Sequence, residues 1–178
     1  RFIMAIDSNN PNLFNFAGKK VVIIGASGFI GSHLADSLLL HGFYVHAISR
    51  TFPGLLTEYA ISHPFFTYHV VDITNPSNLQ EILNGADFVV HLASGCLPQN
   101  SNEFPHNDVQ VNLLGSLNVL DNCVAADVKR LIFISSGGTV YGTPAYVPID
   151  ELHPTDPMCS YGINKLAIEK YLALYKSL

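Results

Sequence analysis

Two groups of residues in this chain have the types and the spacing that chemistry requires. Gly25, Gly28 and Gly31 lie in the segment VVIIGASGFIGSHL, directly after a short apolar run and at the start of a helical pattern. Tyr161 and Lys165 lie four residues apart in the segment SYGINKLAIEK. Residues four apart share one face of a helix, so the phenol and the ammonium group would lie within one turn. The first group predicts anion binding, and the second predicts proton transfer.

The glycine segment has the features of a loop that binds the pyrophosphate of a dinucleotide. Gly25 allows a tight turn, Gly28 lets the backbone approach the pyrophosphate, and Gly31 lets the helix pack closely on the strand. Amide groups and the positive end of the helix dipole then face the anion. A strand-to-helix turn without a ligand is the alternative, but the strand and helix context favours binding. Phe29 and Ile30 belong to the same predicted cofactor site.

Tyr161 needs help to act as a base near neutral pH. The pKa of a free tyrosine is near 10, so a phenolate requires a drop of about three units, or about 4 kcal/mol. The ammonium group of Lys165 and an oxidised nicotinamide ring would both favour the phenolate. A Tyr and a Lys at this spacing also occur on ordinary helices. Their place downstream of the glycine loop favours a catalytic role.

The elements that must position these groups alternate along the chain. Short β-branched runs are followed by longer helical patterns, which is typical of a parallel sheet covered on both faces. We therefore predict an α/β fold, a Rossmann-type doubly wound parallel sheet, in residues 19–178. The expected strands are Val21–Ile24, Tyr44–Ile48, Phe66–Val71, Phe88–His91 and Leu131–Ser135, and the expected helices are Phe29–His41, Pro76–Leu83, Val109–Ala126 and Ser160–Ser177.

Two segments lie outside this alternation. Residues 1–18 are rich in asparagine and show no sustained period, which predicts an N-terminal extension. Residues 137–157 contain four prolines and predict a long loop after the fifth strand. Long loops in compact domains often carry function, so this loop is a candidate part of the site.

Composition excludes several classes of protein. A chain of 178 residues, 48% of them hydrophobic, suits one domain. A net charge of −5 with nine Lys and Arg makes nucleic-acid binding a poor expectation. No apolar run has the length of a membrane span, and the start of the chain lacks the order of a secretory signal, so we expect a cytoplasmic protein without a membrane partner.

The cysteines and histidines show no ligand pattern. Cys96, Cys123 and Cys159 are irregularly spaced and are interpreted as reduced thiols. The eight histidines never form an H-x-x-x-H or H-E-x-x-H pattern, so no metal site is predicted.

The choice between NAD and NADP rests on the end of the second strand. An acidic residue that would bind the adenine ribose hydroxyls is expected there. This chain has Ser49 followed by Arg50. An arginine could neutralise a 2′-phosphate with paired hydrogen bonds. We therefore expect NAD or NADP as the cofactor, with NADP slightly favoured, and a solvent-exposed Arg50 without a ligand is the alternative.

These motifs resemble those of the extended short-chain dehydrogenase/reductases. The G-x-x-G-x-x-G spacing followed by FIGSHL is similar to that group, and the pattern Y-G-x-x-K-L-x-x-E resembles its NAD-dependent epimerase/dehydratase branch, that of the enzymes like UDP-glucose 4-epimerase. The resemblance covers residues 20–178. It implies that Tyr161 and Lys165 are catalytic and touch the cofactor, and that Asn112 helps hold the lysine and a proton-relay water. It also places further residues around the cofactor, namely Asp72, Ile73, His91, Leu92, Ala93 and Ser94.

One position departs from the pattern of that family. The segment ISSGGTVYG resembles the S-S-x-x-x-V-Y-G segment of sugar-nucleotide epimerases, in which a hydroxyl group three residues before the valine holds the substrate oxygen. Here that position is Gly137. Either Ser136 or Thr139 replaces that hydroxyl group, or Tyr161 alone holds the substrate oxygen. Ordinary turn hydroxyls are the alternative for both Ser136 and Thr139. The donor bears on rate, because a hydrogen bond to a developing oxyanion is worth several kcal/mol.

The resemblance implies a sugar-nucleotide epimerase or dehydratase that oxidises a sugar hydroxyl through a transient keto intermediate, with Tyr161 as the base. An NADPH-dependent carbonyl or keto-sugar reductase would use the same residues. A truncated dinucleotide-binding module without turnover is the third possibility, because family members continue into a substrate-binding domain that is absent from this chain. The family also implies a nucleotide-sugar substrate and a homodimer through the helices at 109–126 and 160–177.

Overall fold

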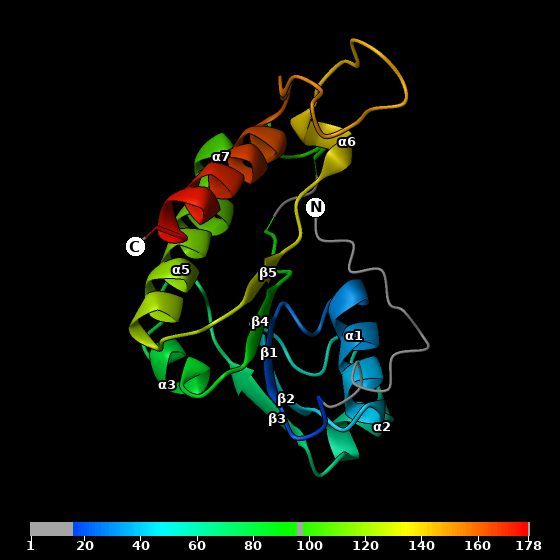
Figure 1. The fold of residues 1–178 in the computed structure, drawn as a ribbon, viewed down its shortest axis with the longest axis vertical. Helices are drawn as coiled ribbons and strands as arrows, with labels where there is room; N and C mark the ends of the chain where they lie inside the picture. Colours follow the sequence, from blue (N-terminus) through cyan, green and yellow to red (C-terminus); the bar gives the residue numbers. More distant parts are fainter. Residues whose placement is uncertain (1–15, 96–97, 178) are drawn as a thin grey trace.

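Five strands form one parallel sheet in the computed structural model, which describes residues 16–95 and 98–177. The strand order is β3-β2-β1-β4-β5 (Figure 1). Every pairing between neighbouring strands is parallel. This order places the first strand at the centre, as in a doubly wound nucleotide-binding sheet. The predicted fold class is confirmed, and the strands are β1 (Lys20–Ile24), β2 (Tyr44–Ser49), β3 (Phe66–Val70), β4 (Phe88–His91) and β5 (Leu131–Phe133).

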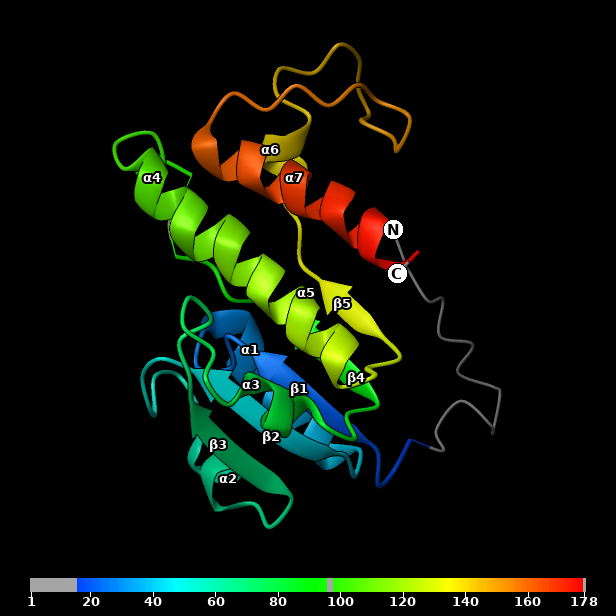
Figure 2. The ribbon, with the colours of Figure 1, turned by 90° about the vertical axis from the view of Figure 1, so that its left-hand side faces the viewer.

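Helices cover both faces of the sheet. Helices α1 (Phe29–Leu40) and α2 (Glu58–Ser62) lie on one face, and α3 (Leu79–Leu83), α5 (Gly115–Ala125) and α7 (Ser160–Tyr175) lie on the other (Figures 1 and 2). Strand side chains alternate between the two faces. Val21 and Ile23 therefore pack with α1, whereas Val22 and Ile24 pack with α3 and α5. All four are buried, which explains why β1 is apolar throughout.

The helix predicted at Val109–Ala126 starts earlier and is not continuous. It begins with α4 (Pro105–Asp108), passes through a π-helical turn, η2 (Val109–Leu114), and continues as α5. Pro105 occupies the first turn, where its missing N–H costs nothing. The polar residues that follow it have no apolar period, so the pattern could not reveal this start. Asn112 lies inside η2, and π-helical turns are frequent at functional sites.

Smaller differences follow from element length. The loop predicted at 137–157 opens with one helical turn, α6 (Gly137–Val140), and α2 was not predicted at all. Both are too short to show a helical period. Helix α3 starts at Leu79 rather than at Pro76, and α7 ends at Tyr175 rather than at Ser177.

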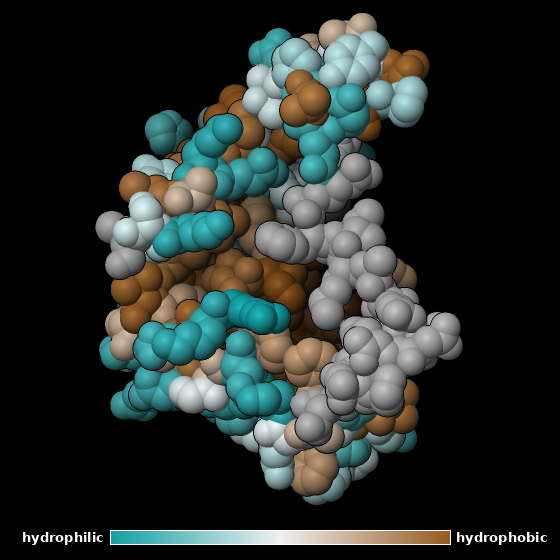
Figure 3. Space-filling model, viewed as in Figure 1, coloured by the Kyte–Doolittle hydropathy of each residue, from teal (hydrophilic) through white to brown (hydrophobic). Residues whose placement is uncertain are grey.

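Strand β5 forms one edge of the sheet and has an open side. Ile132 and the following Ile134 are 50% and 40% exposed. Figure 3 shows apolar surface in a hollow near the middle of this view, at the level of β5 in Figure 1. The central strands β1 and β4 are largely buried, so the edge at β5, like the opposite edge at β3, is more exposed than the middle of the sheet.

Some predictions fall outside the described residues, namely those for Cys96 and for most of the N-terminal extension, residues 1–15. Phe16, from the end of that extension, stacks on Phe43 with ring centroids 6.1 Å apart. Cys123 and Cys159 are free thiols. Among the helices of residues 16–95 and 98–177, none is long and apolar enough to cross a membrane. The same residues contain no cluster of three His, Cys, Asp or Glu side chains that would hold a metal ion.

Candidate active site

A groove of about 260 Å³ lies at the carboxyl ends of the central strands. Ligands of open parallel sheets bind at this edge, where the strand order reverses. Nine of the predicted cofactor residues line the groove: Gly25, Gly28, Ser49, Arg50, Asp72, Ile73, Leu92, Ala93 and Ser94. They come from the ends of four strands, so only the fold brings them together.

The three glycines differ in how strictly the fold requires them. Gly25 has φ +91°, and a Cβ atom there would lie 2.7 Å from the backbone nitrogen of Ala93. A Cβ atom at Gly31 would lie 2.5 Å from the carbonyl oxygen of Gly25. At Gly28 the same atom would meet only that oxygen, at 3.4 Å, which is an ordinary contact. The fold itself therefore requires Gly25 and Gly31, whereas Gly28 leaves room at the start of α1.

Seven residues that were placed at the cofactor from the sequence do not line the groove: Phe29, Ile30, Gly31, His91, Asn112, Tyr161 and Lys165. Phe29 and Ile30 are 70% and 56% exposed on the first turn of α1. Only their backbone amides, at the N-terminus of that helix, are placed to face an anion. Asn112, Tyr161 and Lys165 also lie outside the groove lining, on η2 and α7.

At the end of β2, Ser49 is buried and Arg50 is exposed. The Ser49 hydroxyl donates to the carbonyl oxygen of Ile48 at 2.7 Å and accepts from the backbone N–H of Ser27 at 3.0 Å. It therefore ties β2 to the glycine loop. Arg50 is exposed at the rim of the groove.

Asp72 brings a carboxylate to the same end of the groove. Its Oδ1 accepts from the backbone N–H of Thr74 at 2.9 Å and from the Thr74 hydroxyl at 2.8 Å. These hydrogen bonds, followed by the charge of Arg50, hold the pKa of Asp72 below its usual value. The prediction considered only the end of β2, and it did not weigh this carboxylate from β3 against Arg50.

Lys165 is buried beside Tyr161 in the first two turns of α7. Its ammonium group donates to the carbonyl oxygen of Ile134 at 2.9 Å and lies 5.4 Å from the centre of the Tyr161 ring. It also lies 4.5 Å from the centre of the Phe133 ring. Burial lowers the pKa of Lys165 to about 8. The two side chains thus share one face of the helix, as their spacing indicates.

The expected lowering of the Tyr161 pKa is not present in the protein alone. Burial raises the pKa of this phenol, and a hydrogen bond with Ser94 acts in the opposite direction. The negative charge of Asp108 adds to the rise. The prediction counted Lys165 and overlooked the loss of solvent around the ring. A phenolate at Tyr161 therefore depends on further positive charge, such as that of an oxidised nicotinamide.

The segment after β5 leaves the third catalytic position open. Gly137 starts α6, and a Cβ atom there would meet nothing within 4 Å. Ser136 precedes it without a capping hydrogen bond from its side chain, and the Thr139 hydroxyl donates to the Ser136 carbonyl oxygen at 3.4 Å. Gly162 of α7 packs on the backbone of Thr139, so α6 lies against α7.

Several residues of the site were missed from the sequence. Ser27, Thr51 and Val111 also line the groove, and Ser27 could have been found because it lies within the glycine loop. A buried carboxylate, Asp108, accepts hydrogen bonds from Asn112 and from two residues of α7. Nothing in the local pattern around Asp108 indicates these contacts, because its partners on α7 lie more than 50 residues away.

Comparisons with known proteins agree with this geometry. The family described as "NAD dependent epimerase/dehydratase family" matches residues 21–177. A putative UDP-glucose 4-epimerase of Methanocaldococcus jannaschii is 34% identical over 160 residues, which cover 89% of this chain and 51% of that protein.

Two solved structures have the same fold. One is UDP-N-acetylglucosamine 4-epimerase from Methanobrevibacter ruminantium in complex with UDP-N-acetylmuramic acid, with a TM-score of 0.83 and 30% identity over 90% of this chain and 51% of that one. The other is UDP-glucose 4-epimerase from Brucella ovis in complex with NAD, with a TM-score of 0.80 and 29% identity over 89% of this chain and 48% of that one. The chain thus spans about half the length of the proteins that it matches.

Proposed function

This chain belongs to the NAD-dependent epimerase/dehydratase family, and on that premise we propose that it forms the cofactor-binding part of a sugar-nucleotide epimerase or dehydratase. One observation carries the proposal. Ser94 lines the groove at the end of β4, and it also forms a hydrogen bond with the phenol of Tyr161. A ligand in the groove would therefore end beside the reactive pair.

The residues present fit the roles that such a reaction needs. A bound nicotinamide supplies the acceptance and the return of a hydride. Tyr161 would take the proton from a sugar hydroxyl while the hydride on the same carbon would pass to the nicotinamide, and the two losses together would leave a keto-sugar; Tyr161 would give the proton back when the hydride returns. The Lys165 ammonium group, 5.4 Å from the Tyr161 ring centre, favours the charged phenolate. Its hydrogen bond to the carbonyl oxygen of Ile134 holds it at the residue that follows β5.

The carboxylate of Asp72 bears on the choice of cofactor. Arg50 at the groove rim would bind a 2′-phosphate, which was the reason to favour NADP. Asp72 interacts electrostatically with the same arginine and would repel a phosphate. The Brucella ovis relative is described with NAD, and the preference for NADP finds no support among these relatives. We therefore expect NAD to bind at least as tightly as NADP.

The hydroxyl that holds the substrate oxygen comes from the start of α6 in this proposal. Ser136 directly precedes Gly137, and Thr139 lies two residues after it, where its backbone packs on Gly162 of α7. Replacing each in turn, as Ser136→Ala and Thr139→Val, identifies the donor. The variant that loses the donor should turn over at least tenfold more slowly, because one such hydrogen bond is worth several kcal/mol.

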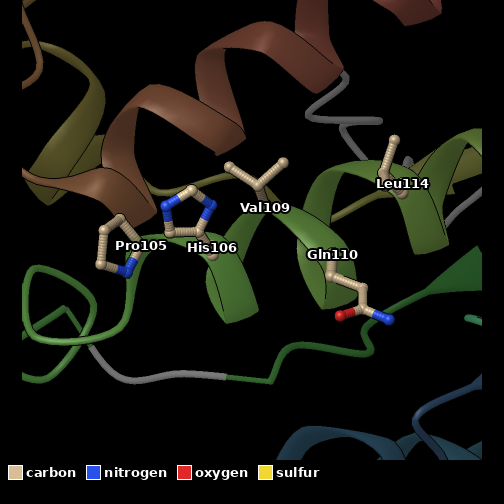
Figure 4. A pocket seen from close by; sticks show the side chains of 5 residues that line it. All are labelled: Pro105, His106, Val109, Gln110 and Leu114. Atoms are coloured by element: carbon tan, nitrogen blue, oxygen red, sulfur yellow. The ribbon is translucent and has the colours of Figure 1, made fainter.

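A homodimer through the helices at 109–126 and 160–177 is part of the proposal. These helices expose large apolar side chains, among them Val109, Leu114 and Ile163. A surface cavity of about 500 Å³ lies on α4 and η2, and Figure 4 shows Val109 and Leu114 projecting to the same side of η2 there. Sedimentation of the wild type and of a Leu114→Glu variant tests this surface. A wild-type dimer that dissociates in the variant is expected, and a wild-type monomer would contradict it.

The function is tested with NAD and a nucleotide sugar. We expect the protein to convert UDP-glucose to its 4-epimer, or to a keto-sugar, without net formation of reduced cofactor. Net consumption of NADPH with a carbonyl compound would favour a reductase instead. Tight binding of NAD without turnover of any nucleotide sugar would favour a binding module, which the open position at Gly137 would suit.

A further inference from the structure

The carboxylate of Asp108 is the most deeply buried charge near the catalytic pair. Asp108 is the last residue of α4, and its exposed fraction is 0%. Burying a carboxylate without partners is costly, so such groups are held by hydrogen bonds or by an opposite charge. The partners of Asp108 therefore show what this charge stabilises.

Two of these partners belong to the first turns of α7. The Asp108 Oδ2 atom accepts from the Ser160 hydroxyl at 2.6 Å and from the Asn164 side-chain amide at 2.8 Å. Ser160 directly precedes Tyr161, and Asn164 directly precedes Lys165. One carboxylate thus holds both of the positions next to the reactive side chains.

The third partner links Asp108 to the groove. Asn112, one π-helical turn further on, donates to Asp108 Oδ1. The Asn112 side-chain oxygen in turn accepts from the backbone N–H of Gly95 at 2.9 Å and from the Ser94 hydroxyl at 3.2 Å. The chain of contacts therefore runs from the catalytic helix to the loop after β4, which lines the groove.

The charge of Asp108 also balances that of Lys165. Burial lowers the pKa of Lys165, and the negative charge of Asp108 acts in the opposite direction. The other titratable groups near this ammonium are His91 from β4, Tyr161 from α7 and Glu169, which lies one turn further along α7. Of these groups, Asp108 is the one whose charge raises the pKa of Lys165.

We propose that Asp108 is a positioning residue, which clamps the start of α7 to η2 and so sets Tyr161 and Lys165 relative to the groove. It touches neither the groove nor the reacting atoms, and it acts through Ser160, Asn164 and Asn112. Its description as a positioning residue for catalysis rests on the function proposed above. The clamp itself does not rest on that function, so it can be tested without substrate or cofactor.

The far end of α7 offers a matched control. There Asp121 of α5 accepts from the Tyr175 hydroxyl at 2.5 Å. Asp108→Asn and Asp121→Asn thus remove the same charge from the two ends of one helix. The first measurement is the amide hydrogen exchange of residues 163–167. The second is the pKa of Lys165, which is monitored by NMR of ¹³Cε-labelled lysines; the Lys165→Arg variant assigns its signal.

In Asp108→Asn we expect exchange at residues 163–167 to become about tenfold faster, because the start of α7 opens locally. We also expect the pKa of Lys165 to fall below its wild-type value, because a balancing charge is lost while burial remains. Asp121→Asn should change neither quantity at that end of α7. A turnover assay is not needed, so a failure of the proposed function leaves this result readable.

Two results would overturn the proposal. A pKa of Lys165 that rises toward its value in water would show that Asp108 only keeps solvent out. Unchanged exchange at residues 163–167 would show that it clamps nothing. If Asp108→Asn does not fold, Ser160→Ala removes one donor and keeps the charge. That variant should speed exchange at the start of α7 with the pKa of Lys165 unchanged, and wild-type exchange in it would equally refute the clamp.

Discussion

The glycine-loop end of the site and its reacting end are built in opposite ways. At the glycine loop, a Cβ atom on Gly25 or Gly31 would lie within 3 Å of neighbouring backbone. At the reacting end, a Cβ atom on Gly137 would meet nothing within 4 Å, and the nearby edge strand exposes Ile132. Packing therefore fixes the binding end, whereas the chemistry of the reacting end is open to substitution without loss of the fold.

The largest expected effect comes from Gly25→Ala. The alanine would have to keep a backbone φ of +91°, and its Cβ atom would lie 2.7 Å from the backbone nitrogen of Ala93. Strain and overpacking together should lower the free energy of unfolding by about 2–4 kcal/mol and abolish NAD binding. Denaturant unfolding and a NAD titration measure the two losses.

Gly28→Ala is the control for this prediction. Its Cβ atom has an ordinary contact of 3.4 Å, so the variant should unfold like the wild type and lose only NAD affinity. If Gly28→Ala binds NAD normally, the pyrophosphate does not approach the backbone at Gly28. If Gly25→Ala retains full stability, the contrast between the two ends of the site fails.

The second prediction concerns Gly137→Ser. Space around this position accepts the side chain, so the unfolding free energy should change by less than about 0.5 kcal/mol. The hydroxyl would stand where the resemblance to sugar-nucleotide epimerases implies one, and we expect it to raise turnover about tenfold. Gly137→Ala separates the hydroxyl from the added volume. Equal turnover of the two variants would mean that Gly137 does not occupy the position of the missing donor.

Arg50→Ala should have a smaller effect, limited to the cofactor. Loss of the guanidinium group should weaken NADP about fivefold more than NAD, because only NADP carries the 2′-phosphate. The two dissociation constants are measured side by side in the wild type and the variant. An equal change for both cofactors would show that Arg50 does not reach the ribose.

The smallest expected effect is a dependence of stability on pH at the edge of the sheet next to β3. His46 Nδ1 lies 3.0 Å from His69 Nε2, and burial, followed by the charges of Lys20 and His69, lowers the pKa of His46 to about 4. As the pH falls, the unfolded chain therefore binds a proton at His46 before the folded chain does. Stability should be fully present above about pH 6.5 and decline toward pH 4, by about 1 kcal/mol because the ring is only half-buried.

His46→Asn tests this dependence against His33→Asn, which changes an exposed residue of α1. The His46 variant should have a flatter stability profile between these pH values. Part of the decline should remain, because burial also lowers the pKa of His91, to about 3. A profile identical to that of the wild type would show that the His46–His69 pair is not a source of the acid sensitivity.

Local patterns were sufficient for the sheet and for the glycine loop. Each strand is a short apolar run, and Gly25–Gly31 interact with one another and with the next strand. The start of α4 and the π-helical turn at Asn112 had no such pattern, because polar residues begin that helix and distant contacts shape it. The rise that burial causes in the pKa of Tyr161 was not predicted, since burial depends on the packing of α7 against the rest of the chain.

The catalytic pair shows where sequence reasoning stops. The spacing of Tyr161 and Lys165 places them on one face of a helix, and the structure has them there. Asp108 lies more than 50 residues before its partners Ser160 and Asn164, so no spacing rule connects them. Most residues that line the groove were accessible from the sequence, whereas the contacts of Asp108 with α7 were not.

The central claim is that the groove binds a dinucleotide and that Tyr161 does the chemistry. Tyr161→Phe tests both parts in one protein, because it removes a single hydroxyl group. We predict that NAD affinity stays within about threefold of the wild type, while conversion of UDP-glucose falls by at least about 100-fold, as expected for the loss of a general base. Conversion at the wild-type rate in this variant would contradict the account.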